Sequence, residues 1–181
     1  DGSNSSYGTC IVATISGTSV SFGSKTVISS ATTYFTSTVY DPTGGRVWVS
    51  YATTGNGIDL KSGTISGTTF GVGSATNISS GFGDSSLVYD TNADKLVTVY
   101  RDGTNSNYGT AKVGTISGTS MSFGNFITVD DKNVDSAEVR FNKNFEDRIL
   151  SVYTDEDADA GDPGRAKIKA GLIDGSGITF G

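Results

Sequence analysis

The residues best suited to recognising a ligand lie in two polar loops with nearly the same sequence. DGTNSNYGT at Asp102–Thr110 matches the opening DGSNSSYGT with an offset of 101 positions. Carboxylates and amides hydrogen-bond to sugar hydroxyls, and an aromatic ring stacks on the apolar face of a sugar. The candidate ligand-binding residues are therefore Asp102, Asn105, Asn107 and Tyr108, with Asp1, Asn4 and Tyr7 at the matching positions. Recurrence predicts shallow, multivalent sites; the alternative is that Asp and Asn only cap turns.

A second candidate is the acidic run from Asp155 to Gly161, DEDADAG. Carboxylates at alternate positions followed by glycine are similar to calcium loops, so Asp155, Asp157 and Asp159 are candidate calcium ligands and calcium is a possible cofactor. The glycine comes one position late, and no glutamate follows at the expected distance. The alternative is a solvated acidic face, because residues 130–162 hold 11 of the 19 acidic residues.

Catalytic chemistry has few candidates in this chain. The sequence contains no histidine, which excludes Ser-His-Asp and Cys-His catalysis and histidine-ligated zinc. Glycoside hydrolysis needs only two carboxylates, so it remains an alternative function. Glu138 is the nearest candidate acid, but an alternating strand places it on the same face as Arg140, which predicts an ion pair. We expect a protein that is not an enzyme.

Charge and composition limit the partners further. The net charge of −6 disfavours nucleic acid and anionic membrane surfaces. No apolar run is long enough for a membrane span. Cys10 is the only cysteine, so an intrachain disulfide is impossible, and we expect Cys10 to be a small core residue.

The elements that must position these loops come from an internal repeat. TISGTSVSFG at Thr14–Gly23 returns as TISGTTFGVG at Thr64–Gly73, as TISGTSMSFG at Thr115–Gly124 and in a decayed form as LIDGSGITFG at Leu172–Gly181. The spacings between the closing glycines are 50, 51 and 57 residues. Alternating segments on both sides of the central Gly predict a hairpin with its turn at that glycine.

Each full repeat is predicted to form four antiparallel strands and no helix. In the first full repeat the strands are predicted at Phe35–Tyr40, Arg46–Ala52, Ile58–Ser66 and Thr69–Ile78. In the second, the fourth strand is predicted at Thr119–Val129. Four strands in about 50 residues are typical of a β-propeller blade, so the expected fold class is all-β, a β-propeller. A β-solenoid or fibre is the alternative.

The phase of the repeat divides the chain into a half-blade at 1–32 and blades at 33–81, 82–133 and 134–181. These are about three and a half blades, which cannot close a ring. We therefore expect further repeats in a longer natural chain, or other chains that complete the ring. Open strand edges favour self-association.

VYRDGTNSNYGTAKVGTISGTSMSFG at Val99–Gly124 resembles repeats of marine phage tail-fibre-like proteins and of secreted, lectin-like surface proteins. The resemblance covers nearly the whole chain but departs in the last repeat. It implies a propeller fold and an extracellular or virion-surface location. With the polar loops, it leads to the expectation of a carbohydrate-binding or adhesion module for glycans or cell-surface polysaccharide. The alternative is a structural component of a virion, tail fibre or extracellular assembly.

Overall fold

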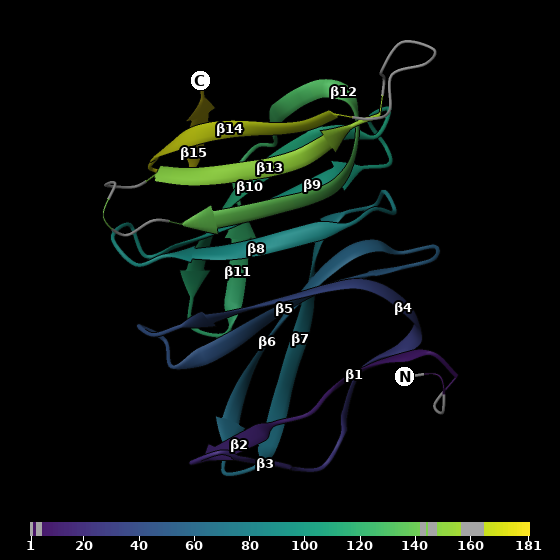
Figure 1. Cartoon of the computed structure of the whole chain (residues 1–181), viewed down its shortest axis with the longest axis vertical. Coiled ribbons are helices and arrows are strands. Elements are labelled where there is room, and N and C mark those ends of the chain that lie inside the picture. Colours follow the sequence, from purple (N-terminus) through teal and green to yellow (C-terminus); the bar gives the residue numbers. More distant parts are fainter. Residues whose placement is uncertain (1, 3–4, 142–143, 145–147, 157–164) are drawn as a thin grey trace.

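The computed structural model describes residues 2, 5–141, 144, 148–156 and 165–181, and the regular structure of these residues consists of antiparallel β-strands. The all-β prediction is therefore confirmed. The repeats follow one another along the long axis of the molecule, from the N-terminal strands at one end to β14 and β15 at the other (Figure 1). The strands are β1 (Tyr7–Cys10), β2 (Ala13–Ser16), β3 (Ser19–Phe22), β4 (Thr26–Asp41), β5 (Arg46–Thr53), β6 (Gly57–Ser66), β7 (Thr69–Ser79), β8 (Ser85–Asp90), β9 (Lys95–Asp102), β10 (Tyr108–Ser117), β11 (Ser120–Phe123), β12 (Ile127–Phe141), β13 (Arg148–Asp155), β14 (Arg165–Asp174) and β15 (Gly177–Phe180).

The repeated TISG segment forms a two-residue hairpin turn each time it occurs. Gly17, Gly67, Gly118 and Gly175 have φ values of 59°, 58°, 58° and 60°. A glycine with positive φ at the first central position is what a type II′ hairpin turn needs. The predicted role of this glycine is confirmed, and it holds in the diverged last repeat as well.

Strand pairing changes partner within two long strands. In β4, Thr32 pairs with Tyr7 of β1, whereas Thr33 pairs with Thr53 of β5. In β12, Asn133 pairs with Tyr108 of β10, and the next residue pairs with Asp155 of β13. Each long strand thus ends one repeat and begins the next without a break.

One strand prediction was wrong for a reason of pairing. The predicted fourth strand Thr119–Val129 is divided into β11 and the start of β12, which pair with different parts of β10. A similar division separates β1 from β2 in the N-terminal segment, residues 7–16. Its counterparts β6 and β10 are continuous because they also pair along their length with β5 and β9. In the described part of residues 1–32, β1 pairs with β4 and β2 with β3.

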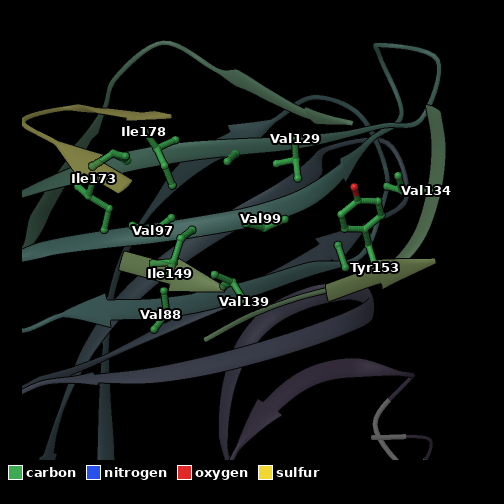
Figure 2. Packing of buried hydrophobic residues seen from close by; sticks show 13 residues of the cluster. Val88, Val97, Val99, Val129, Val134, Val139, Ile149, Tyr153, Ile173 and Ile178 are labelled. Carbon is green, nitrogen blue, oxygen red and sulfur yellow. The ribbon is translucent and has the colours of Figure 1, made fainter. Parts of the chain in front are cut away.

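In the middle strands, alternate residues face the preceding repeat and the following repeat. In β9, Leu96 and Tyr100 pack against Trp48 and Leu60 of the first full repeat, while Val97 and Val99 pack against the third. Figure 2 shows this second core, where valines of β8 and β9 meet Val139, Ile149 and Tyr153. Since both faces of these strands are covered, successive repeats are held together by continuous apolar cores.

Serine hydroxyls join the first strands of consecutive repeats. Ser37 Oγ accepts a hydrogen bond from the backbone N–H of Leu87 at 3.1 Å. At the matching position, Ser86 Oγ accepts from the N–H of Val139 at 3.2 Å. The first strands therefore lie side by side along the stack, at the same edge of each repeat.

Candidate functional site

Three exposed aromatic side chains form a cluster where the first full repeat meets the second. The ring of Phe82 lies 5.4 Å from that of Tyr34 in an edge-to-face arrangement and 5.6 Å from that of Phe35. Their exposed fractions are 39%, 42% and 48%, respectively. Tyr34 and Phe35 lie on β4, and Phe82 lies in the connection from β7 to β8. We call these three residues the aromatic cluster.

The backbone at one member of the cluster is strained. Phe35 has a φ of 48°, which is unusual for a bulky residue because its Cβ crowds the backbone in the left-handed region. It lies at the irregularity between Tyr34 and Ser37 in the pairing of β4 with β5. The strained backbone holds the Phe35 ring beside its two partners, and residues in such conformations are frequent at functional sites.

The polar loop 102–107 lies directly against the aromatic cluster. A Cβ on Gly103 would lie 2.6 Å from the carbonyl oxygen of Phe82, and one on Gly81 would lie 2.6 Å from the backbone nitrogen of Thr104. These approaches leave no room for side chains, so both glycines are required by close backbone contact. The backbone of the loop therefore packs on the backbone of the segment that carries Phe82.

Asp102 organises this loop from a buried position. Its Oδ1 accepts hydrogen bonds from the Thr104 hydroxyl at 2.6 Å, the Thr104 N–H at 3.0 Å and the Ser79 hydroxyl at 3.1 Å. Its carbonyl accepts from the N–H groups of Asn105 and Asn107, both at 3.0 Å. Asp102 thus shapes the turn, which agrees with the capping alternative for this residue.

A pocket of about 500 Å³ opens between the end of β7 and the second full repeat. Its lining includes Asn77, Tyr100, Asp102, Asn105, Lys112 and Phe126. Phe126 is 58% exposed, so its ring is accessible to a ligand. We call this space the inter-repeat pocket.

The charged side chain of Lys112, which lines the inter-repeat pocket, is held by contacts with neighbouring residues. The Lys112 ammonium donates a hydrogen bond to the carbonyl of Ile78 at 2.5 Å and lies 6.0 Å from the centre of the Tyr100 ring. Desolvation lowers the pKa of Lys112, and the Asp102 carboxylate opposes this shift. Burial, assisted by the charge of Asp102, raises the pKa of Tyr100, so this hydroxyl remains protonated at neutral pH.

The same lysine contact occurs in all three full repeats. Lys61 donates to the carbonyl of Ile28 at 2.7 Å, and Lys169 donates to that of Val129 at 2.6 Å. A second pocket, of about 360 Å³, adjoins Lys61 and is lined by Tyr51, Thr53 and Asn56. Each lysine therefore joins its repeat to the preceding one, and the joints at Lys61 and Lys112 carry pockets.

At the third joint, charged side chains occupy the corresponding place. Lys167 bridges Asp155 at 2.6 Å and Asp130 at 3.3 Å, and the Tyr153 hydroxyl donates to Asp130 at 2.7 Å. Asp155, a candidate calcium ligand, is thus paired with a lysine. The other two candidates, Asp157 and Asp159, lie outside the described residues. Within those residues the structure has no group of three or more potential metal ligands.

The sequence-derived ligand residues are only partly brought together. Asp102 and Asn105 line the inter-repeat pocket, whereas Asn107 and Tyr108 are not among its lining residues. The carbonyl of Asn107 accepts from the N–H of Val134 at 3.0 Å, and its φ is 59°, so it has a role in the turn. Tyr7 begins β1 and pairs with Thr32. Asp1 and Asn4 lie outside the described residues.

Two expectations about individual side chains can be compared with the structure. Glu138 and Arg140 form the predicted ion pair at 2.6 Å, with both side chains largely exposed. Cys10 is half-buried at the end of β1 and packs beside the core of Ile28 and Val49. Burial raises the pKa of its thiol.

Sequence reasoning missed the aromatic cluster and the lysines. A signal for the lysines exists, because Lys-x-Gly recurs at Lys61–Gly63, Lys112–Gly114 and Lys169–Gly171. The aromatic cluster has no counterpart in the repeat. Tyr34 and Phe35 are adjacent in the chain, and they meet the distant Phe82 only because β4 and the β7–β8 connection are neighbours in space.

Comparisons with known proteins assign no family to this chain. Neither protein-family models nor curated proteins match it. In the described part of the chain, no helix could span a membrane.

Proposed function

We propose that this chain is a non-enzymatic carbohydrate-binding module, and that the sugar is bound by the aromatic cluster together with the loop at Asp102–Asn105. The observation that carries the proposal is the grouping of three exposed aromatic rings beside a polar loop. Exposed aromatic groups cost free energy in water, and contiguous apolar patches rimmed by polar residues mark interaction sites.

The chemistry of this surface suits a pyranose ring. The faces of Tyr34, Phe35 and Phe82 offer apolar area with few rotatable bonds, so little side-chain entropy is lost on binding. The side chains of Asn105 and Thr104, in the loop whose backbone adjoins that of Phe82, offer donors and acceptors for hydroxyl groups. In the inter-repeat pocket, Phe126, Asn77 and Asn105 combine the same two kinds of group and could hold a further sugar unit.

The scaffold that we propose for this site is a set of β-propeller blades. Each full repeat has four strands, the first strands lie side by side, and successive repeats pack through apolar cores on both faces. These three features are expected of adjacent blades. An extracellular or virion-surface setting, as in the tail-fibre-like and secreted proteins that the repeat resembles, would suit glycan binding.

The test is a glycan array probed with the 181-residue chain, with and without calcium, followed by calorimetry on any sugar that binds. Phe82→Ala should weaken binding about 5- to 30-fold, because a lost stacking contact is worth about 1–2 kcal/mol. Tyr40→Ala is the matched control, since Tyr40 is 59% exposed on the same strand β4 but is not part of the cluster.

The binding data for the two variants test the proposed surface, and the comparison with and without calcium tests a role for the metal. Weaker binding by Phe82→Ala with unchanged binding by Tyr40→Ala supports the proposed surface. An array without any bound glycan, or equal affinities for the two variants, rejects it. A requirement for calcium would assign the metal a part in binding, and the same affinity in a chelator would exclude that part.

A further inference from the structure

The pocket beside Lys61 repeats the inter-repeat pocket one repeat earlier in the chain. Its lining residues fall between positions 27 and 75, and those of the inter-repeat pocket between positions 77 and 126. Both pockets lie at joints inside the chain, and the same part of the repeat bounds each of them. We call this space of about 360 Å³ the Lys61 pocket. Three residue types recur at matching positions of the two linings: Tyr51 and Tyr100, Asn56 and Asn105, and Lys61 and Lys112.

Two of the positions that differ change what each pocket can bind. Where the inter-repeat pocket has the ring of Phe126, the Lys61 pocket has Ala75. Where the inter-repeat pocket has Asp102, the Lys61 pocket has Thr53. Asp102 is already bonded within its own loop, since its Oδ1 accepts from the Thr104 hydroxyl at 2.6 Å. The Thr53 hydroxyl has no hydrogen-bond partner among the residues that the structure describes.

This unpaired hydroxyl points to a ligand in the Lys61 pocket. Thr53 ends β5 and is 1% exposed. A buried hydroxyl without a partner costs free energy in the folded protein, and buried polar groups are nearly always bonded to protein or to ordered water. Because Thr53 lines the pocket, a hydroxyl group bound there would supply the missing partner.

The charges at the Lys61 pocket favour an uncharged ligand. Asp59 and Lys61 both line it, so one carboxylate balances one ammonium group. The ammonium donates to the carbonyl of Ile28 at 2.7 Å, and the carboxylate accepts from the amide of Asn77 at 2.9 Å. Sugar hydroxyls both donate and accept, so they suit a lining that offers a carboxylate, an amide and a hydroxyl. The volume also lies in the range of small-molecule pockets, about 300–1,000 Å³.

We propose that the Lys61 pocket is a second sugar-binding site, which takes one uncharged monosaccharide unit through Asn56 and Asp59 at its rim and Thr53 at its base. The ligand class rests on the proposed function, but the residues differ from those of the aromatic cluster and of the loop at Asp102–Asn105. Together with the inter-repeat pocket, this site would hold one polysaccharide chain at two points. Two linked contacts raise the apparent affinity for a polymer without any new contact.

The experiment is a titration of the intact, ¹⁵N-labelled chain with D-glucose, D-galactose and D-mannose at millimolar concentrations, followed by nuclear magnetic resonance. The backbone amides report the two sites separately. Those of Thr53, Asn56 and Lys61 report the Lys61 pocket, whereas those of Phe82 and Gly103 report the surface under Proposed function. We expect saturable shifts at Thr53, Asn56 and Lys61 with at least one of the three sugars.

Two substitutions test the residues of the pocket. Asn56→Ala removes an exposed amide side chain, and Thr53→Val removes the hydroxyl but keeps the shape of the side chain. Each should weaken binding in this pocket about 3- to 10-fold, as the loss of one hydrogen bond does. Thr53→Val should leave the free energy of unfolding equal or higher, because the hydroxyl has no partner to lose among the described residues.

Each substitution has a matched control. Thr54→Ala changes an exposed neighbour that does not line the Lys61 pocket. Thr98→Val removes another fully buried hydroxyl that lacks a partner among the described residues, and Thr98 lines neither pocket. Both controls should bind each sugar as the unmodified chain does.

The site-resolved shifts separate this inference from the proposed function. Shifts at the Lys61 pocket without shifts at Phe82 and Gly103 would support this site and count against the proposed surface. The reverse pattern, or no shifts at either place, would overturn this inference. It would also be overturned if neither Asn56→Ala nor Thr53→Val weakened binding, or if the controls weakened it equally. An effect of Asn56→Ala alone would support the site and remove Thr53 from it.

Discussion

At the scale of single residues, each full repeat buries a tyrosine near the end of its second strand: Tyr51, Tyr100 and Tyr153. Burial raises the pKa of Tyr51 to about 12, with a smaller contribution from the charge of Asp59. Burial also raises the pKa of Tyr153, and its hydrogen bond to Asp130 adds to the shift. The folded chain therefore keeps these protons at pH values where the unfolded chain loses them.

The consequence is a loss of stability in alkaline solution. Between pH 10 and about 12 the folded state binds more protons than the unfolded state, so the free energy of unfolding falls as the pH rises. Each such tyrosine contributes at most about 1.4 kcal/mol per pH unit. Tyr51→Phe should reduce this slope, as measured by urea unfolding at a series of pH values. An unchanged slope in the variant would contradict the assignment.

At the scale of the elements, one glycine in the hairpin of each full repeat makes room for a side chain of the neighbouring strand. A Cβ on Gly63 would overlap the ring of Phe70, and one on Gly114 would overlap the sulfur of Met121. In the last repeat, a Cβ on Gly171 would lie 2.8 Å from Ile178 Cδ1. The first glycine of the repeated Gly-Thr-Ile-Ser-Gly text is thus fixed by packing, and the second by its positive φ.

Gly63→Ala should therefore lower the free energy of unfolding by about 1–3 kcal/mol, as overpacked cores do. Gly71→Ala, on the opposite strand of the same hairpin, is the matched control because its nearest neighbour would lie 3.7 Å away. Both values come from urea unfolding monitored by circular dichroism. If packing is the cause, Phe70→Leu in the Gly63→Ala background should recover part of the loss.

At the scale of the whole molecule, stability is divided among cores that lie between repeats. Leu96 and Ile149 occupy the same repeat position and are almost fully buried. Leu96 belongs to the core between the first and second full repeats, and Ile149 to the core between the second and third. Nearest-neighbour coupling of this kind is typical of repeat proteins.

We expect Leu96→Ala and Ile149→Ala each to lower the free energy of unfolding by about 2–5 kcal/mol. The two substitutions should loosen different repeats. Hydrogen exchange followed by mass spectrometry should show faster exchange in the first and second repeats for Leu96→Ala. For Ile149→Ala, the faster exchange should lie in the second and third repeats. Equal acceleration along the whole chain in both variants would show that the repeats unfold as a single unit.

The sequence by itself determined the strand class, the repeat and its hairpins. These features are local, because alternation of side chains and a glycine with positive φ act within a few residues. The ion pair of Glu138 with Arg140 was predictable for the same reason, as the two residues share one face of one strand. The turn-forming role of Asp102 could also be read locally, because Asp commonly bonds to the backbone two residues on.

Only the tertiary structure decided which surfaces are covered and which residues meet across repeats. Leu150 and Val97 look alike in the sequence, yet one is exposed and the other is buried, because burial depends on the neighbouring repeat. The aromatic cluster joins β4 to a segment nearly 50 residues further along the chain. The continuity of β4 and β12 likewise depends on partners that change along the strand. The aromatic cluster leaves no periodic mark in the sequence, because its residues have no counterparts in the other repeats.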